Sequence, residues 1–242
     1  AGLILGQSVG RYLRRREKYS PLYGMVLSDD KVPSTPYGVV INAIERKPWE
    51  ILVNAEGKRF VQEDHKSIDH IEHQIGKQSA HRHWAILDQR MLNEMPPMIY
   101  DWTNERIMNE AGSHTMFKSA SSIRELAIKS GLHPVNLEKS VNDFNARLKN
   151  KQADSTGRLH RPLAIEEGPF YSVRMSGWSL CSFAGLGVNE NFEVTRPTGE
   201  PIKNLYAIGE VIGFGATSGN AYVNGMGVTP ALTYGRLLGQ RI

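Results

Sequence analysis

The chain has 242 residues, a formal net charge of +4 and 40% hydrophobic residues, enough to build a sizeable core in one large domain or two small ones. Its basic residues are scattered rather than gathered in a stripe with interleaved aromatics, so we expect no nucleic-acid partner. No apolar run approaches the ~20 residues that span a bilayer. A single cysteine, Cys181, excludes an internal disulfide framework and fits a reducing, cytoplasmic location.

The N-terminal quarter predicts one helix followed by strands. Residues 1–10 are apolar and glycine-spaced, which favours a closely packed helix. Residues 37–61 are rich in β-forming side chains. Within them, Ile51 to Asn54 and Lys58 to Val61 predict a hairpin with its turn at Ala55-Glu56-Gly57.

The middle of the chain predicts two helices. Ser122 and Glu125 form a capping-box pattern, and Gly131 is a typical stop signal. Pro134 then suits the first position of a second helix. Four apolar residues recur at helical spacing in this second segment and predict one buried face: Leu137, Val141, Phe144 and Leu148. A polar loop is expected over residues 150–162.

The last third returns to β structure and ends in a helix. Strands are predicted at residues 170–175, 187–195 and 205–208. Thr229 can cap the final helix, with Pro230 at its first position. This order of strands, helical block, strands and helix predicts a helical domain inserted into a mostly β unit.

Two features near the C-terminus suit a bound ligand. Glu210 follows Gly209 at an expected strand end. A carboxylate there can accept hydrogen bonds from sugar-type hydroxyls, or it can simply face solvent. Gly225 and Gly227 permit close backbone approach, and the helix start at Thr229 stabilises negative charge. An ordinary capped helix explains the same pattern.

Other motifs are less specific. The loop Gly213 to Gly219 has a spacing one residue too long for the G-x-G-x-x-G fingerprint, although a nicotinamide-binding reading stays open. His70 and His73 could share a metal on a helix, but no further ligand completes the group, so we predict no metal site. Arg59 or Arg90 could clamp a substrate carboxylate or serve in ordinary ion pairs.

Four stretches together resemble the fumarate reductase/succinate dehydrogenase flavoprotein family: Ile51 to Glu63, Trp84 to Asp88, Gly168 to Tyr171, and Leu205 to Gly239. The helix pair from Ser122 to Leu148 is similar to the mobile cap domain of that family. The resemblance implies an FAD enzyme that moves hydride between flavin and a C–C bond of a small molecule, next to a carbonyl or carboxylate. The cap would exclude water from the reaction.

The resemblance also implies a domain plan. The expected fold is α+β, with a partial FAD-binding β unit that ends in a C-terminal helix and an inserted α+β cap. Residues 1–62 would be the remaining part of the FAD-binding domain, residues 63–165 the cap, and residues 166–242 the C-terminal part of the FAD-binding domain.

Site residues follow from the same resemblance. The catalytic candidates are Tyr222, Arg90 and Glu63, with Glu63 on a proton route and Tyr222 as a general acid or base. The expected FAD contacts are Gly209, Glu210, Asn224, Gly225, Gly227, Val228 and Thr229.

The chain departs from the family pattern in two places. The N-terminal G-x-G-x-x-G motif is absent, so the partner of this chain would be a missing N-terminal FAD-binding segment; the alternative is an inert or partner-binding fragment. Ser182-Phe183 and Tyr222 stand where fumarate reductases carry the His and Arg of their dicarboxylate clamp. This difference argues against fumarate as the substrate and brings the chain nearer the ketosteroid dehydrogenase branch.

Overall fold

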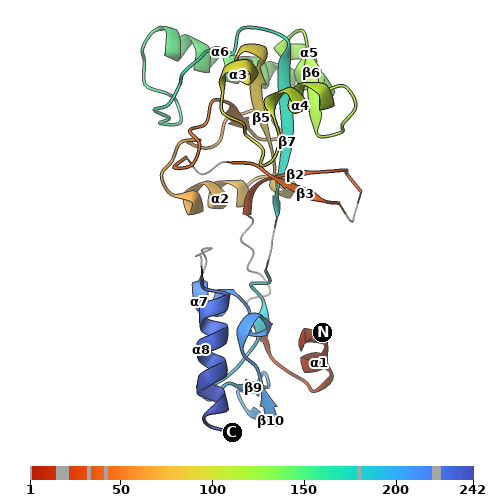
Figure 1. The fold of residues 1–242 in the computed structure, drawn as a ribbon, viewed down its shortest axis with the longest axis vertical. Helices are drawn as coiled ribbons and strands as arrows, with labels where there is room; N and C mark the ends of the chain where they lie inside the picture. Colours follow the sequence, from red (N-terminus) through yellow and green to blue (C-terminus); the bar gives the residue numbers. More distant parts are fainter. Residues whose placement is uncertain (1, 15–21, 32–33, 41–42, 179–180, 220–224) are drawn as a thin grey trace. The chain divides into compact units, whose positions relative to one another are not determined.

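The computed structural model describes residues 2–14, 22–31, 34–40, 43–178, 181–219 and 225–242. The chain forms two compact units (Figure 1). Unit 1 combines both ends of the chain, residues 1–20 and 179–242, and unit 2 is the continuous stretch 21–178. Mixed helix and sheet content confirms the expected α+β class.

Unit 2 contains most of the regular structure. Its elements are β2 (Leu22–Leu27), β3 (Pro36–Gly38), β4 (Ile51–Val53), α2 (Ile68–Gly76), η1 (Ser79–His81), β5 (Arg82–Asp88), α3 (Gln89–Glu94), α4 (Asn104–Glu110), β6 (Phe117–Ala120), α5 (Ile123–Ser130), α6 (Pro134–Lys149) and β7 (Phe170–Trp178).

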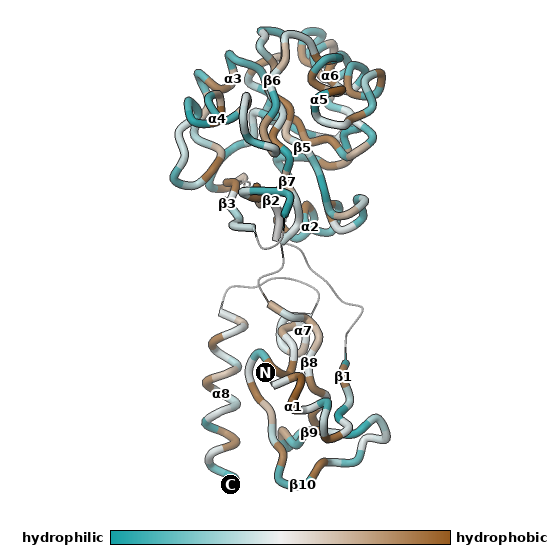
Figure 2. The backbone as a smooth tube through the Cα atoms, turned by 90° about the vertical axis from the view of Figure 1, so that its right-hand side faces the viewer, coloured by the Kyte–Doolittle hydropathy of each residue, from teal (hydrophilic) through white to brown (hydrophobic). Residues whose placement is uncertain are grey.

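An antiparallel sheet holds unit 2 together, in the order β3-β2-β7-β5-β4 with β6 also paired to β7. Strand β7 is central because β5 pairs along seven of its positions on one side, while β6 and β2 divide the other side between them. The β5 sequence is buried at every position after Arg82, which explains its apolar run from Trp84 to Leu87. In Figure 2, the tube is coloured as hydrophobic along this run.

Local signals fixed the two helices of the middle segment as expected. The Ser122 side chain accepts a hydrogen bond from the Glu125 N–H, and Gly131 adopts the left-handed conformation that ends α5. Pro134 occupies the first turn of α6. Leu137, Val141 and Phe144 are buried on one face, and Leu148 is half-buried.

The predicted hairpin is present only in part. Gly57 has a φ of 74° and closes the turn, with hydrogen bonds between Asn54 and Lys58 and between Gly57 and Asn54. The returning segment forms a single bridge, Val53 to Arg59, rather than a strand. Arg59 instead turns its side chain into a buried ion network, described below.

Unit 1 contains short elements around a small core. They are α1 (Gly2–Ser8), β1 (Leu13–Arg14), β8 (Gly185–Leu186), β9 (Glu193–Thr195), β10 (Pro201–Tyr206), η2 (Gly209–Ile212), α7 (Gly215–Ser218) and α8 (Val228–Gly239). β1 pairs with β8, and β9 pairs with β10. The buried cluster of this unit consists of Leu186, Val194, Ala207 and Ile212.

The strand predicted over residues 187–195 is present only in part, as β9 at its end and a bridge between Val188 and Val194. The structure has β8 before this stretch and β9 at its end, with a turn between them. The Asn189 side chain makes the turn by accepting hydrogen bonds from the N–H groups of Asn191 and Glu193. Phe192 takes a positive φ of 64° there.

The units divide the chain at residues 20/21 and 178/179, whereas the expected boundaries lay at 62/63 and 165/166. The reason is the sheet: β2 pairs with β7, β4 pairs with β5, and β3 pairs with β2, so residues 22–53 belong to unit 2. The assignment of the units to a flavin domain and a cap stays a prediction. Among the described helices, none is both long and apolar enough to cross a membrane.

Candidate functional site

A cavity of about 510 Å³ lies within unit 1, in the size range of small-molecule sites. One wall comes from η2, through Gly209, Glu210 and Ile212, and the opposite wall from the segment that begins α8. Its lining is mostly apolar, and among the described lining residues Glu210 carries the one charged side chain.

A close chain crossing positions the η2 wall. The Phe214 N–H donates to the Ser182 carbonyl at 2.8 Å, and the backbones of Gly185 and Gly213 meet there. A Cβ on Gly213, whose φ is +87°, would come 2.6 Å from the Phe183 carbonyl oxygen. These positions therefore accept glycine alone, and the crossing fixes the cavity floor relative to β8.

The expected cap of the final helix is wrong in detail. α8 begins at Val228 after Gly227, and no side-chain hydrogen bond caps it. Thr229 lies inside the first turn and donates its N–H to the Gly225 carbonyl at 2.9 Å. Gly227 and Val228 nevertheless line the cavity, which brings the positive end of the α8 dipole to its wall.

Glu210 is an exposed carboxylate at the cavity. It lies in η2 rather than at a strand end, because β10 ends at Tyr206. Cys181 lines the same cavity, and burial, with added repulsion from Glu210, raises the pKa of its thiol. The thiol is therefore held neutral near neutral pH.

The cavity brings together most of the expected cofactor contacts. Five of them line it: Gly209, Glu210, Gly225, Gly227 and Val228. Thr229 is adjacent in the helix but is not part of the lining. Asn224 and the catalytic candidate Tyr222 lie outside the described residues.

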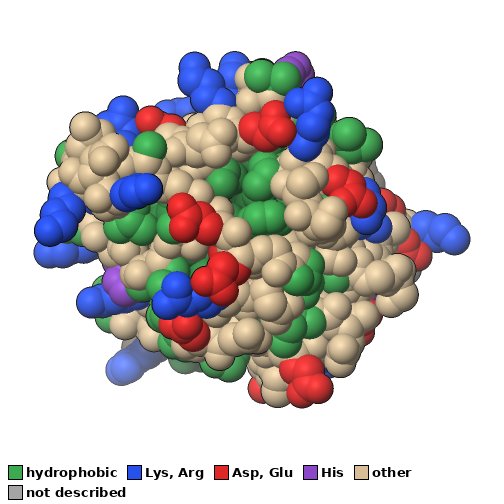
Figure 3. Space-filling model, turned by 90° about the horizontal axis from the view of Figure 1, so that it is seen from above, with side chains coloured by type: hydrophobic (Ala, Val, Ile, Leu, Met, Phe, Trp, Pro, Cys, Tyr) green, Lys and Arg blue, Asp and Glu red, His purple; other side chains and the backbone are tan. Residues whose placement is uncertain are grey.

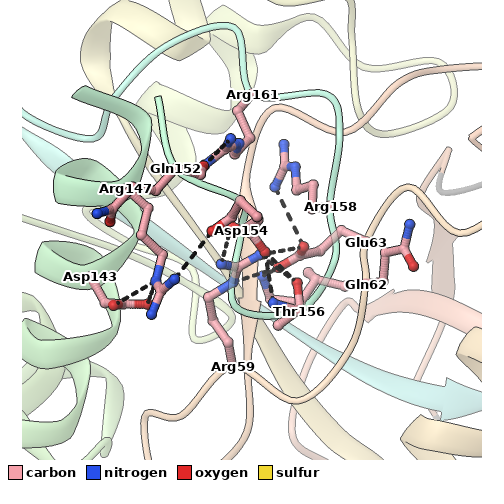
Figure 4. A network of polar contacts seen from close by, with 12 residues as sticks. Arg59, Gln62, Glu63, Asp143, Arg147, Gln152, Asp154, Thr156, Arg158 and Arg161 are labelled. Atoms are coloured by element: carbon pink, nitrogen blue, oxygen red, sulfur yellow. Dashed lines mark hydrogen bonds and ion pairs between the residues drawn. The ribbon is translucent and has the colours of Figure 1, made fainter. Parts of the chain in front are cut away.

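Glu63 is buried in an ion network of unit 2 (Figure 4). Arg59 grips it with two hydrogen bonds, Nε to Oε1 at 3.1 Å and Nη2 to Oε2 at 2.7 Å. Arg59 also binds Asp154, and Arg158 lies 3.7 Å from the Glu63 carboxylate. Glu63 Oε1 accepts a further bond from the Leu52 N–H. The carboxylate is thus fully engaged by protein groups.

Burial of Asp154 tends to raise its pKa, but hydrogen bonds from Arg59 and Thr156 outweigh it and lower the pKa to about 2. Asp154 and Arg158 were not predicted as site residues, because both lie in the stretch 150–162, which the sequence predicts as a polar loop. Arg158 is nearly fully buried and donates to the carbonyls of Pro48, Glu50 and His160, contacts that no local sequence pattern marks.

Arg90 lies elsewhere in unit 2, on α3, with a half-exposed side chain. It pairs with Glu94 at 2.9 Å and approaches Glu167 at 3.5 Å. The structure therefore gives Arg90 and Glu63 separate partners and does not join them in one network. Within the described residues no group of three or more His, Cys, Asp or Glu is placed to hold a metal.

Comparison with known proteins identifies the class. The family described as "FAD binding domain" matches residues 30–227, so the chain belongs to this family of flavoproteins. The match agrees with the resemblance to the fumarate reductase/succinate dehydrogenase flavoproteins and identifies FAD as the cofactor.

Individual relatives are distant. A probable fumarate reductase of Shewanella frigidimarina is 23% identical over 83% of this chain. The 4-oxocyclohexanecarboxylate 2-dehydrogenase of Sinomonas cyclohexanicum is 25% identical over 100% of this chain. The crystal structure of a 3-ketosteroid delta1-dehydrogenase from Sterolibacterium denitrificans matches the fold with a TM-score of 0.68 at 18% identity, covering 98% of this chain and 45% of that one. The chain spans 32% and 44% of the length of the two curated relatives.

The cavity fits part of an FAD molecule. Bare glycine backbone at Gly209, Gly225 and Gly227 leaves room for a flat ring system, and Glu210 offers an acceptor for hydroxyl groups. No cationic side chain stands among the described lining residues to receive a pyrophosphate. The residues present thus fit the flavin and sugar-alcohol end of the cofactor better than its phosphates.

Proposed function

We propose that this chain is the C-terminal portion of an FAD-dependent oxidoreductase that transfers hydride between flavin and a C–C bond activated by a carbonyl or carboxylate. The cavity between η2 and the start of α8 is the observation that carries the proposal, because it gathers five expected cofactor contacts in a chain of the FAD binding family. Unit 2 would act as the cap over the substrate. A cytoplasmic location stays a prediction.

Each cavity group has a role under this proposal. Glu210 would accept hydrogen bonds from FAD hydroxyls, and the helix start at Gly227 and Val228 would stabilise negative charge on the reduced flavin ring. Bound flavin would supply the hydride chemistry. Tyr222 would serve as the general acid or base, and Thr229 and Asn224 would support the ring from the same segment.

The alternative is a fragment that needs a further segment before it can act. α8 supports this reading, because none of its residues is buried and both Val228 (67% exposed) and Leu232 (71% exposed) present apolar side chains to solvent. Figure 2 shows hydrophobic residues distributed along the helix. A missing N-terminal FAD-binding segment would supply the phosphate cradle that the cavity lacks.

An absorption titration of this chain with FAD, between 350 and 500 nm (a range chosen for flavin bands), separates the two readings. Retention of stoichiometric flavin after gel filtration would show that this half-site suffices. A protein fraction without flavin bands after gel filtration from excess FAD would indicate that the missing segment is required. The same titration on the longer protein would then follow.

Replacing Glu210 with glutamine is expected to weaken flavin retention about tenfold, because it removes a charge-assisted acceptor worth ~1.5 kcal/mol. The protein that retains flavin, this chain or the longer one, is used for the measurement. Glu200→Gln, in the exposed turn before β10, is the matched control in the same unit. Equal flavin content in the two variants would remove Glu210 from the site.

Replacing Tyr222 with phenylalanine in the longer enzyme is expected to reduce turnover by a factor of 10² or more while the flavin spectrum stays unchanged. Both quantities are read on the same preparation, so loss of flavin and loss of the proton donor are distinguished. Full turnover in the variant would exclude Tyr222 as the acid or base.

A further inference from the structure

Unit 2 has a second cavity, of about 300 Å³, that the proposed flavin chemistry does not use. It opens where β5, β6 and β7 meet the C-terminal end of α5, and its lining includes Trp84, Lys118, Lys129, Ser172 and Arg174. Three of these five side chains are cations. Asp30 is the one carboxylate among the described lining residues.

Strand register explains why the cations converge. On β7, Ser172 and Arg174 are two residues apart and so point to the same face of the sheet. Lys118 of β6 is directly opposite Ser172, and Trp84 of β5 is directly opposite Arg174. Lys118 and Arg174 are therefore diagonal neighbours of like charge on one face, an arrangement that favours an anion between them.

Of the three cations, Lys118 has the fewest hydrogen-bond and ion-pair partners among the described residues. Its Nζ donates to the His114 carbonyl at 3.3 Å, and among the described residues it makes no ion pair. Lys129 bonds the Ser119 carbonyl and pairs with Glu125 at 2.9 Å in a half-exposed contact of little energetic weight. Both ammonium groups retain donors for a ligand.

Arg174 already binds one carboxylate, the side chain of Asp30. Its guanidinium pairs with the half-exposed carboxylate of Asp30, which comes from the loop after β2. Its Nε contacts the Met116 sulfur at 3.1 Å, which fixes the planar head at the cavity wall. Asp30 thus shows that the position accepts a carboxylate.

Two further groups suit a ligand of this charge. The hydroxyls of Ser130 and Ser172 lie 2.5 Å apart at the cavity wall, and Trp84 supplies an apolar side for a carbon skeleton. The C-terminal end of α5 carries a partial negative charge of about −0.5 and repels an anion. This charge is smaller in magnitude than the combined positive charge of the three cations. Glu125 and Asp30 are half-exposed carboxylates, and a ligand can displace them from Lys129 and Arg174.

We propose that this cavity binds a small oxyanion, a carboxylate or phosphoryl group, with Lys118 and Arg174 as its charged contacts and Asp30 as an internal competitor. The site is independent of the flavin proposal, since all of its residues belong to unit 2 and none lines the cavity of unit 1. Ligand binding would release Asp30 from Arg174.

The test is calorimetric titration of the full chain with inorganic phosphate and, separately, with benzoate, at ionic strength held constant with chloride. Saturable binding of at least one probe is expected, and the tighter probe identifies the phosphoryl or carboxylate class. Failure of both probes to saturate would overturn the proposal.

Variants assign the binding to this cavity. Lys118→Gln and Arg174→Gln are each expected to weaken binding at least tenfold, whereas Asp30→Asn should strengthen it at least threefold. Arg124→Gln, which removes an exposed cation of α5 paired with Glu138, is the control and should change nothing. Binding that survives Lys118→Gln unaltered would overturn the site even if Arg174→Gln fails to fold.

Discussion

Replacing Arg59 with methionine is expected to lower the free energy of unfolding of unit 2 by about 3–5 kcal/mol. The Arg59 and Glu63 side chains are 5% and 1% exposed, and Asp154 is buried with them. Methionine keeps the packing over Phe144, whose ring centre is 5.3 Å from the guanidinium carbon. The cost therefore does not arise from a cavity. It arises because buried Asp154 loses its cation and buried Glu63 keeps only the more distant Arg158, at 3.7 Å.

Urea unfolding monitored by tryptophan fluorescence measures this loss specifically, because all four tryptophans of the chain belong to unit 2. The matched control is Arg124→Met, which breaks an exposed pair with Glu138 and is expected to cost about 0.5 kcal/mol. A loss below about 1 kcal/mol for Arg59→Met would mean that water reaches the Glu63 carboxylate and that the network is not a structural anchor.

Unit 2 is expected to lose stability steeply as the pH falls below 6.5, at up to ~1.4 kcal/mol per pH unit for a single buried histidine. His83 is fully buried in β5, and burial lowers the pKa of its imidazole to about 3, against a weaker opposing hydrogen bond with the His81 backbone. The folded protein therefore binds no proton at His83 where the unfolded chain does. Its contribution is complete above pH 6.5 and is lost progressively toward pH 3.

The variant His83→Leu should flatten this dependence between pH 6.5 and 4.5, as measured by the same fluorescence assay over a pH series. The window is distinct from that of Glu50 and Asp154, whose pKa values are lowered to about 2 and whose effects begin below about pH 4.5. The control is His70→Gln, at an exposed ring of α2 whose pKa is also lowered, by slight burial and by neighbouring His and Lys charges. It should leave most of the pH dependence in place. Identical slopes in wild type and His83→Leu would show that His83 does not titrate on unfolding.

Charged residues on the surface of unit 2 have little part in either prediction. Figure 3 shows cationic and anionic side chains interspersed on the face seen from above. Pairs such as Lys129 with Glu125 are exposed and screened by solvent, so each contributes only tenths of a kcal/mol. The expected effects are large at Arg59 and His83 because those groups are removed from water.

Elements specified by neighbouring residues could be predicted from the sequence. Helices α5 and α6 follow from a cap at Ser122, a left-handed glycine at Gly131 and a proline at position 134, all of which act within one turn. The family resemblance also pointed to residues that the structure brings together, because Gly209-Glu210 and Gly225 to Val228 are contiguous motifs that line one cavity. Their contact with FAD stays a prediction.

Features that depend on distant partners could not be predicted. Arg59 finds Asp154 across 95 positions of sequence, and no local pattern marks that pair. β2 joins unit 2 through pairing with β7, which lies at the other end of the unit. The predicted start of α8 is wrong for another reason. Neither Gly227 nor Val228 has a side chain that caps a helix, so the sequence points to Thr229 as the cap.

The pairing of β2 with β7 has a consequence for how the chain could have been assembled. Leu22 and Trp178, the first and last strand positions of unit 2, are register partners, so this unit enters and leaves through adjacent strands. For the rest of the polypeptide, the 158 residues of unit 2 therefore act like a short loop, because their two ends are already held side by side. The entropic cost of closing this loop is small. Such a module can be exchanged for another as a cassette, with both splice points at one place.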